Sequence, residues 1–103
     1  MTAGARATTK TEIHHLLEKR MVENMQEGTF KIAKQEVDSK IPSLVLDSSI
    51  HQQITNELRQ RIPYGIENYN NLSKEVILKN YHEVYKNFGM DEYVRNYIEP
   101  LFK

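Results

Sequence analysis

The sequence predicts an all-α protein, a small bundle of four to five short helices with no sheet. Apolar residues recur at helical spacing along most of the chain. Serine and threonine stand where the helices would begin, and glycine or proline stands where they would end. Residues 43–47 have β-branched character but are too few to support a sheet, so we expect them to form an extended connector packed on the core.

A chain of 103 residues has room for one domain. We expect residues 1–9 to form a disordered polar arm, because the segment contains no acid and no apolar run. A short organellar presequence is the alternative for the same segment. Residues 10–103 then form a single helical domain. We expect it to be intracellular and not membrane-bound, because cysteine is absent and no apolar run approaches the roughly 20 residues of a transmembrane helix.

A first helix is predicted over residues 10–27. Its apolar side chains fall at helical spacing and are Ile13, Leu16, Leu17, Met21 and Met25. A second helix is predicted over 29–40, ending ahead of Pro42, because proline disfavours helix in the residue before it. Gly28 either ends the first helix or kinks one continuous helix, and we favour the break.

Three more helices follow, over residues 49–62, 73–88 and 91–99. Between the first two of them, residues 63–72 are rich in Pro, Gly and Asn and predict a loop. Ser73 is the expected N-cap of the helix after that loop. The apolar faces of these helices predict a core that includes Ile54, Leu58, Ile77, Tyr81 and Val84.

The composition argues against most kinds of chemistry. Because there is no cysteine, disulfides, thiolate zinc sites and cysteine nucleophiles are excluded. The four glycines are isolated and form no phosphate-binding loop. Fourteen basic residues balance fourteen acidic ones, whereas nucleic-acid binders usually carry a basic surplus. We therefore expect no enzyme and no cofactor, and we consider nucleic acid an unlikely partner.

Two sets of histidines are candidates for a metal or catalytic site. His14 and Glu18 lie four residues apart, the spacing of a two-ligand metal clip on a helix, but no third ligand accompanies them. His51 and His82 lie on separate predicted helices and could meet in space. Neither has a serine or an acid beside it in a nucleophile pattern. We expect no metal ligands and no catalytic residues among them.

The C-terminal aromatic segment is the most distinctive feature of the sequence. The last helix is short and carries apolar groups around more of its surface than one face can bury. We therefore predict a partner-binding surface formed by Tyr85, Phe88, Tyr93, Tyr97, Ile98, Leu101 and Phe102.

The expected function is that of a non-catalytic helical subunit or adaptor in a larger assembly. It would bind another protein, or a second copy of itself, through this apolar and aromatic face. The alternative is a nucleic-acid-associated domain with a helix-turn-helix built from residues 49–62 and 73–88. The loop of ten residues between these helices is long for that motif.

Overall fold

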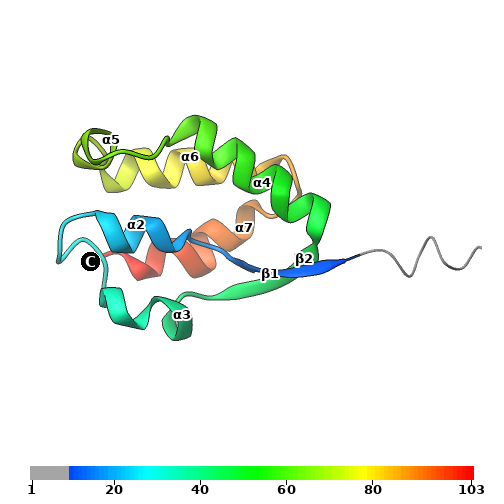
Figure 1. Cartoon of the computed structure of the whole chain (residues 1–103), viewed down its shortest axis with the longest axis horizontal. Helices are drawn as coiled ribbons and strands as arrows, with labels where there is room; N and C mark the ends of the chain where they lie inside the picture. Colours follow the sequence, from blue (N-terminus) through cyan, green and yellow to red (C-terminus); the bar gives the residue numbers. More distant parts are fainter. Residues whose placement is uncertain (1–9) are drawn as a thin grey trace, which may run out of the picture.

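The computed structural model describes residues 10–103. The predicted polar arm and its presequence alternative, residues 1–9, lie outside the described residues. These residues form two strands and six α-helices, which are labelled in Figure 1: β1 (Thr11–His15), α2 (Lys19–Asn24), α3 (Val37–Lys40), β2 (Ser43–Asp47), α4 (Ser48–Arg61), α5 (Ile66–Asn70), α6 (Lys74–Lys86) and α7 (Asp91–Tyr93). Shorter 3₁₀ and π turns cover Lys34–Glu36, Val94–Ile98 and Glu99–Leu101.

The prediction of a bundle of four to five helices without a sheet is wrong. Of the residues that the structure describes, 60% are helical, and they include a two-stranded antiparallel sheet. The register of this sheet runs from Thr11 opposite Asp47 to His15 opposite Ser43. The predicted helix over 10–27 therefore begins as a strand, and only Lys19–Asn24 is helical. Each strand is too short to be recognised alone, and each is stabilised by hydrogen bonds to a segment far away in the sequence.

The predicted helix over 29–40 is formed only in its second part, as the 3₁₀ turn Lys34–Glu36 followed by α3. Its beginning pairs with the C-terminus: Lys31 N–H donates to Leu101 O over 2.7 Å, and Lys103 N–H donates to Thr29 O over 3.1 Å. Gly28, with a φ of +96°, lies in the turn that precedes this pairing. No continuous helix runs through Gly28, but α2 already ends at Asn24, so Gly28 lies in a separate turn and does not end the helix as predicted.

The second half of the chain agrees more closely with the predicted helices. The boundaries of α4 and α6 differ from the predicted ones by one or two residues. Ser73 caps α6, since its Oγ accepts the backbone N–H of Val76 over 3.2 Å. The predicted loop over 63–72 contains the short helix α5. The five predicted core residues are all fully buried: Ile54, Leu58, Ile77, Tyr81 and Val84.

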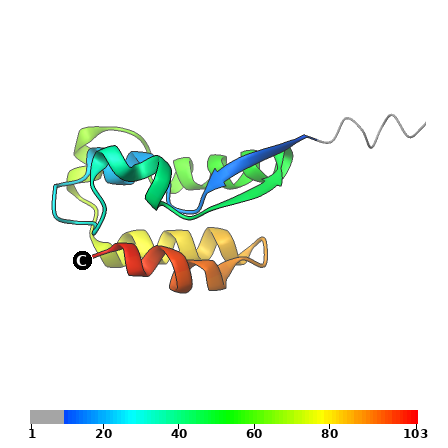
Figure 2. The same cartoon turned by 90° about the horizontal axis from the view of Figure 1, so that it is seen from below.

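The arrangement of these elements creates one large core and one projecting ribbon. In Figure 1, α4 and α6 lie above α2 and the C-terminal segment, and the apolar side chains of both groups form the core between them. The ribbon of β1 and β2 packs beside the first half of α4 and extends past it. Figure 2 shows the C-terminal segment alongside α6. Within residues 10–103, no helix is both long enough and apolar enough to span a bilayer.

Candidate functional site

The hydrogen bonds that flank the ribbon define the direction in which each backbone group of β1 points. Leu16 N–H donates to Pro42 O over 2.9 Å, and Ser48 N–H donates to Lys10 O over 2.7 Å. Both pairs continue the register of the sheet, so they are hydrogen-bonded pairs of the antiparallel ladder. Because such pairs alternate with pairs that are not hydrogen-bonded, the odd-numbered residues of β1 belong to the second kind.

The odd-numbered residues of β1 therefore direct their N–H and C=O groups away from β2. We call this side of the strand the free edge of β1, formed by Thr11, Ile13 and His15. Within the described part of the chain, β1 pairs with no strand except β2. A strand edge of this kind offers unpaired donors and acceptors to any extended chain that approaches it.

One apolar pair lies on the outer face of the ribbon. Ile13 stands directly opposite Val45, and the two residues are 65% and 67% exposed. In a pair without hydrogen bonds the two Cα atoms lie closer together, so the two side chains form one continuous apolar surface. The outer face of the ribbon thus presents apolar surface next to the free edge of β1.

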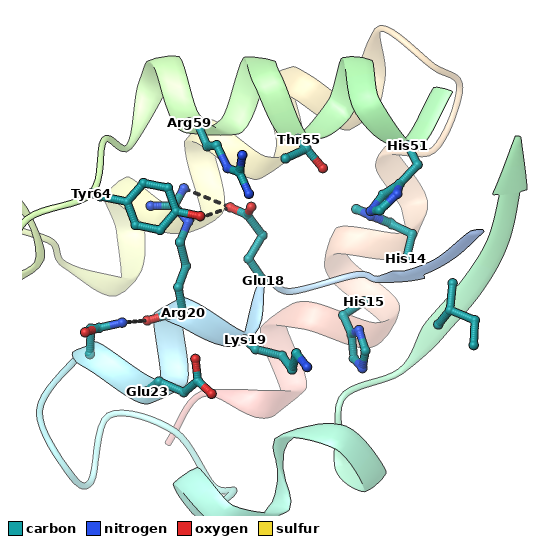
Figure 3. Close-up of a pocket in the computed structure, with 12 residues that line it drawn as sticks. His14, His15, Glu18, Lys19, Arg20, Glu23, His51, Thr55, Arg59 and Tyr64 are labelled. Atoms are coloured by element: carbon teal, nitrogen blue, oxygen red, sulfur yellow. Dashed lines mark hydrogen bonds and ion pairs between the residues drawn. The ribbon is translucent and has the colours of Figure 1, made fainter. Parts of the chain in front are cut away.

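A cleft of about 600 Å³ opens between β1, α2 and α4. Figure 3 shows side chains from all three elements directed into it. His51, Thr55 and Arg59 follow one another at intervals of four residues, which places them on one face of α4. Ile13 and His15, two residues of the free edge, line the same cleft. The cleft therefore has a polar helix face on one wall and the free edge of β1 on another.

A buried charge network supports the inner end of the cleft. Arg20 is almost fully buried and donates from Nε and Nη2 to Oε1 of Glu18, over 3.0 and 2.8 Å. Its Nη1 donates to the hydroxyl of Tyr69 over 3.3 Å. The backbone N–H of Glu18 donates to the hydroxyl of Tyr81 over 3.1 Å. Because a buried charge is costly without a partner, this network fixes the start of α2 against α5 and α6.

Tyr64 closes one end of the cleft and contacts two guanidinium groups. The Cζ atom of Arg20 lies 4.6 Å from the centroid of the Tyr64 ring, and that of Arg59 lies 5.3 Å from it. Tyr64 itself is 55% exposed. Both distances are within the range of cation–π attraction. The ring therefore holds two positive groups near each other at the mouth of the cleft.

His14 is a neutral, buried histidine in the wall of the cleft. It is 2% exposed, and its Nε2 lies 2.7 Å from the hydroxyl of Tyr85. That hydroxyl donates its own hydrogen to the carbonyl oxygen of Leu16, so Nε2 of His14 carries the hydrogen in this contact. Burial, followed by the nearby imidazoles of His51 and His15, lowers the pKa of His14 from 6.5 to about 4.

The lowered pKa predicts a loss of stability in mild acid. Above pH 6.5 His14 is neutral in the folded and in the unfolded chain. As the pH falls from 6.5 to 4, the unfolded chain binds a proton that the folded chain does not, so the free energy of unfolding decreases. We expect a loss on the order of 3 kcal/mol by pH 4. Urea unfolding of the protein and of His14→Gln across this range measures it. If the free energy of unfolding depended on pH in the same way for both proteins, His14 would not be the source of the loss.

The structure does not bring His14 and Glu18 together as the two-ligand metal site that their spacing suggested. His14 and Glu18 do not share a helix, and each is bonded elsewhere, to Tyr85 and to Arg20. Within residues 10–103, no group of three or more His, Cys, Asp and Glu side chains could hold a metal ion.

His51 and His82 lie on different surfaces of the molecule. His51 packs edge-on against His14, with ring centroids 5.1 Å apart, and its Nδ1 lies 2.7 Å from the carboxylate of Glu12. His82 lines a separate depression with Asp91 and other residues of α6 and the C-terminal segment. The carboxylate of Glu12 accepts a hydrogen from Nδ1 of His51, so this contact orients the ring in the cleft.

The seven residues predicted to bind a partner divide between the core and the surface. Tyr85, Ile98 and Phe102 are buried in the core of the chain itself. Phe88, Tyr93 and Leu101 are partly buried against it, and only Tyr97, at 45%, is an exposed large apolar residue. A role for this segment in partner binding stays a prediction, and the surface that remains for it is small.

Sequence reasoning did not identify the cleft or the free edge of β1. One signal for the cleft was present, since His51, Thr55 and Arg59 recur at intervals of four residues on the polar face of a predicted helix. The sequence contains no comparable signal for the strand, because Ile13 is the single apolar residue between Thr11 and His15.

Comparisons of this chain with models of protein families, with curated proteins and with solved structures find no match, so the site rests on its own geometry.

Proposed function

We propose that this protein is a non-catalytic adaptor or accessory subunit that binds an extended segment of another protein along the free edge of β1. The proposal is supported by the combination of the free edge of β1, which pairs with no further strand among residues 10–103, with an adjoining cleft. Binding of this kind, in which a partner adds a strand to a sheet, obtains affinity from backbone hydrogen bonds and specificity from neighbouring side-chain pockets.

The ribbon would gain stability from a third strand. Two-stranded ribbons are only marginally stable on their own, and this one is supported mainly by α4. A partner strand would satisfy the outward N–H and C=O groups of Ile13 and His15. Its side chains would alternate between the outer face, beside Ile13 and Val45, and the wall formed by α4.

Ile13 also distinguishes this edge from one that is protected against pairing. Proteins usually protect an exposed edge with lysine, proline or a bulge. Here the central residue of the free edge is an exposed isoleucine, and the strand contains neither lysine nor proline. Together with Val45 opposite it, Ile13 gives this edge an apolar surface that a partner strand would cover.

The nucleic-acid alternative has weaker support. In a helix-turn-helix the two helices are joined by a short turn, whereas α5 lies between α4 and α6. The balanced charge of the chain also lacks the basic surplus that phosphate contacts require.

Matched proline substitutions test the role of the free edge. Ile13→Pro removes an N–H that points away from β2, so it should leave the ladder between the strands intact. Val45→Pro makes the same change at the opposite residue, on the other edge of the ribbon, and is the control. We expect Ile13→Pro to reduce the recovery of partner proteins from the native source by about tenfold or more, and Val45→Pro to change it little.

Circular dichroism first establishes that both variants are folded. Recovery is then compared quantitatively for the three proteins under identical conditions, beside their mass by size-exclusion chromatography with light scattering. Equal recovery with Ile13→Pro and the unaltered protein would refute the proposal. A dimer that Ile13→Pro dissociates would identify a second copy of the chain as the occupant and exclude a different partner.

A further inference from the structure

The charged side chains around the cleft leave one arginine without an acidic partner. Lys19 pairs with Asp38 over 2.9 Å, and Arg20 pairs with Glu18 over 2.8 Å. Arg59 forms no ion pair with any residue from 10 to 103. The two hydrogen bonds to Glu18 Oε1 both come from Arg20, so within residues 10–103 Glu18 is the ion-pair partner of Arg20 and not of Arg59. The part of the cleft around Arg59 therefore carries a positive charge that no ion pair within residues 10–103 compensates.

Arg59 is held in a position suited to binding a ligand. Its guanidinium lies over the ring of Tyr64, which restricts its motion before any ligand binds. Thr55, one turn earlier on α4, brings a hydroxyl donor into the same cleft. A guanidinium donates two parallel hydrogen bonds to a carboxylate, and its planar shape matches that group.

The acidic and basic side chains are distributed unevenly along the cleft. Figure 3 shows Glu23 on α2, on the side of the cleft away from α4, while Arg59 and Thr55 project from α4 toward the interior. Glu18 lies between them and is bonded to Arg20. A negatively charged ligand group would be repelled near Glu23 and attracted near Arg59. Glu12 also lies near α4, but it contacts His51, about two helical turns away from Arg59. The favoured position for an anion is thus beside Arg59.

We propose that the segment bound along the free edge of β1 carries a carboxylate that Arg59 and Thr55 bind, an inference that rests on the function proposed above. Ile13 and His15 line the same cleft as Arg59, so one extended chain would contact both the edge and the arginine. The carboxylate belongs either to an aspartate or glutamate side chain or to the C-terminus of the segment, since both present the same group to a guanidinium.

Three synthetic pentapeptides provide the probes. The first is blocked at both ends and carries glutamate between valine and threonine residues, and the second replaces this glutamate by glutamine. The third contains the glutamine and a free C-terminal carboxylate. Each is titrated into the isotope-labelled full chain, with the backbone amides followed by NMR. We expect the glutamate peptide, the free-carboxylate peptide or both to shift the amides of Thr55, Arg59, Ile13 and His15, with an affinity at least about fivefold above that of the second peptide.

Two arginine variants of α4 complete the test. Arg59→Gln should abolish this fivefold difference. Arg61→Gln, on the same helix but paired with Glu83, should retain it. The peptide that binds more tightly than the glutamine peptide shows whether the carboxylate comes from a side chain or from a C-terminus.

The outcomes separate this inference from the function on which it rests. If all three peptides bind with equal affinity, or if Arg59→Gln retains the fivefold difference in affinity, the proposal that Arg59 binds a carboxylate is refuted. The proposal that a partner strand binds along the free edge of β1 is then unaffected. If no peptide shifts the amides of the cleft, the carboxylate inference is also refuted, and the proline variants at Ile13 and Val45 decide separately whether the free edge binds a partner.

Discussion

Truncation of the chain after Gly89 is expected to unfold the whole domain. The segment that is lost supplies four buried side chains to the core: Met90, Val94, Ile98 and Phe102. Each contributes about 1.5–3 kcal/mol when buried, and the total is comparable to the 5–15 kcal/mol by which a typical domain is stable. The aromatic ring of Phe102 also contacts that of Phe30, with centroids 4.6 Å apart.

The truncation removes backbone pairing as well. Without the C-terminus, Lys31 N–H and Thr29 O lose their partners, Leu101 O and Lys103 N–H. Far-UV circular dichroism and urea unfolding would measure the effect. Removal of Lys103 alone is the control, and it should cost no more than about 1 kcal/mol, because a single hydrogen bond is lost. A truncated chain that stays cooperatively folded would mean that the C-terminal segment is dispensable for the core and free to act as an interface.

The helices of the second half could be predicted because the signals that define them are local. Ser73 caps α6 through a hydrogen bond to a residue three positions later, and Pro63 follows the end of α4. Gly89, with a φ of +70°, follows the end of α6. Each of these features acts within one turn of the chain, and the apolar faces of α4 and α6 then determine which side chains are buried.

The ribbon could not be predicted because its stability comes from a partner far away in the sequence. Thr11–His15 continues into the helical spacing of Leu16, Leu17 and Met21, and all three of those side chains are buried as a helical face would require. Ile13 fits the same spacing but is exposed on the ribbon. A periodic pattern therefore identified most of the buried residues correctly while assigning the wrong secondary structure to the segment before them.

The site could not be predicted for the same reason. His14 contacts Tyr85 and His51, and Arg59 shares the ring of Tyr64 with Arg20. Each contact joins segments that are far apart in the sequence. Only the stripe of polar residues on α4 was visible in the sequence, and such a stripe is also what a solvated helix face displays. The tertiary fold is what converts that face into one wall of a cleft.

Replacement of Ile77 by alanine is expected to lower the free energy of unfolding by about 2–4 kcal/mol. Ile77 is fully buried in the first half of α6, in the core where α6 packs against α4. Removing three carbons there leaves a cavity that a close-packed core cannot fill completely. Lys79→Ala, two residues along the same helix, is the matched control. Lys79 is exposed, and its replacement should change stability by less than about 0.5 kcal/mol.

Urea unfolding of the two variants and the unaltered protein measures both changes under the same conditions. Alanine favours helix at least as strongly as either residue that it replaces, so a loss seen only at position 77 reports the core and not the helix itself. Equal losses at the two positions would mean that α6 is oriented differently in the folded protein. In that case the other buried residues of α6 would also be misplaced, including Tyr81 and Tyr85, whose hydroxyl groups contact Glu18 and His14 beside the cleft.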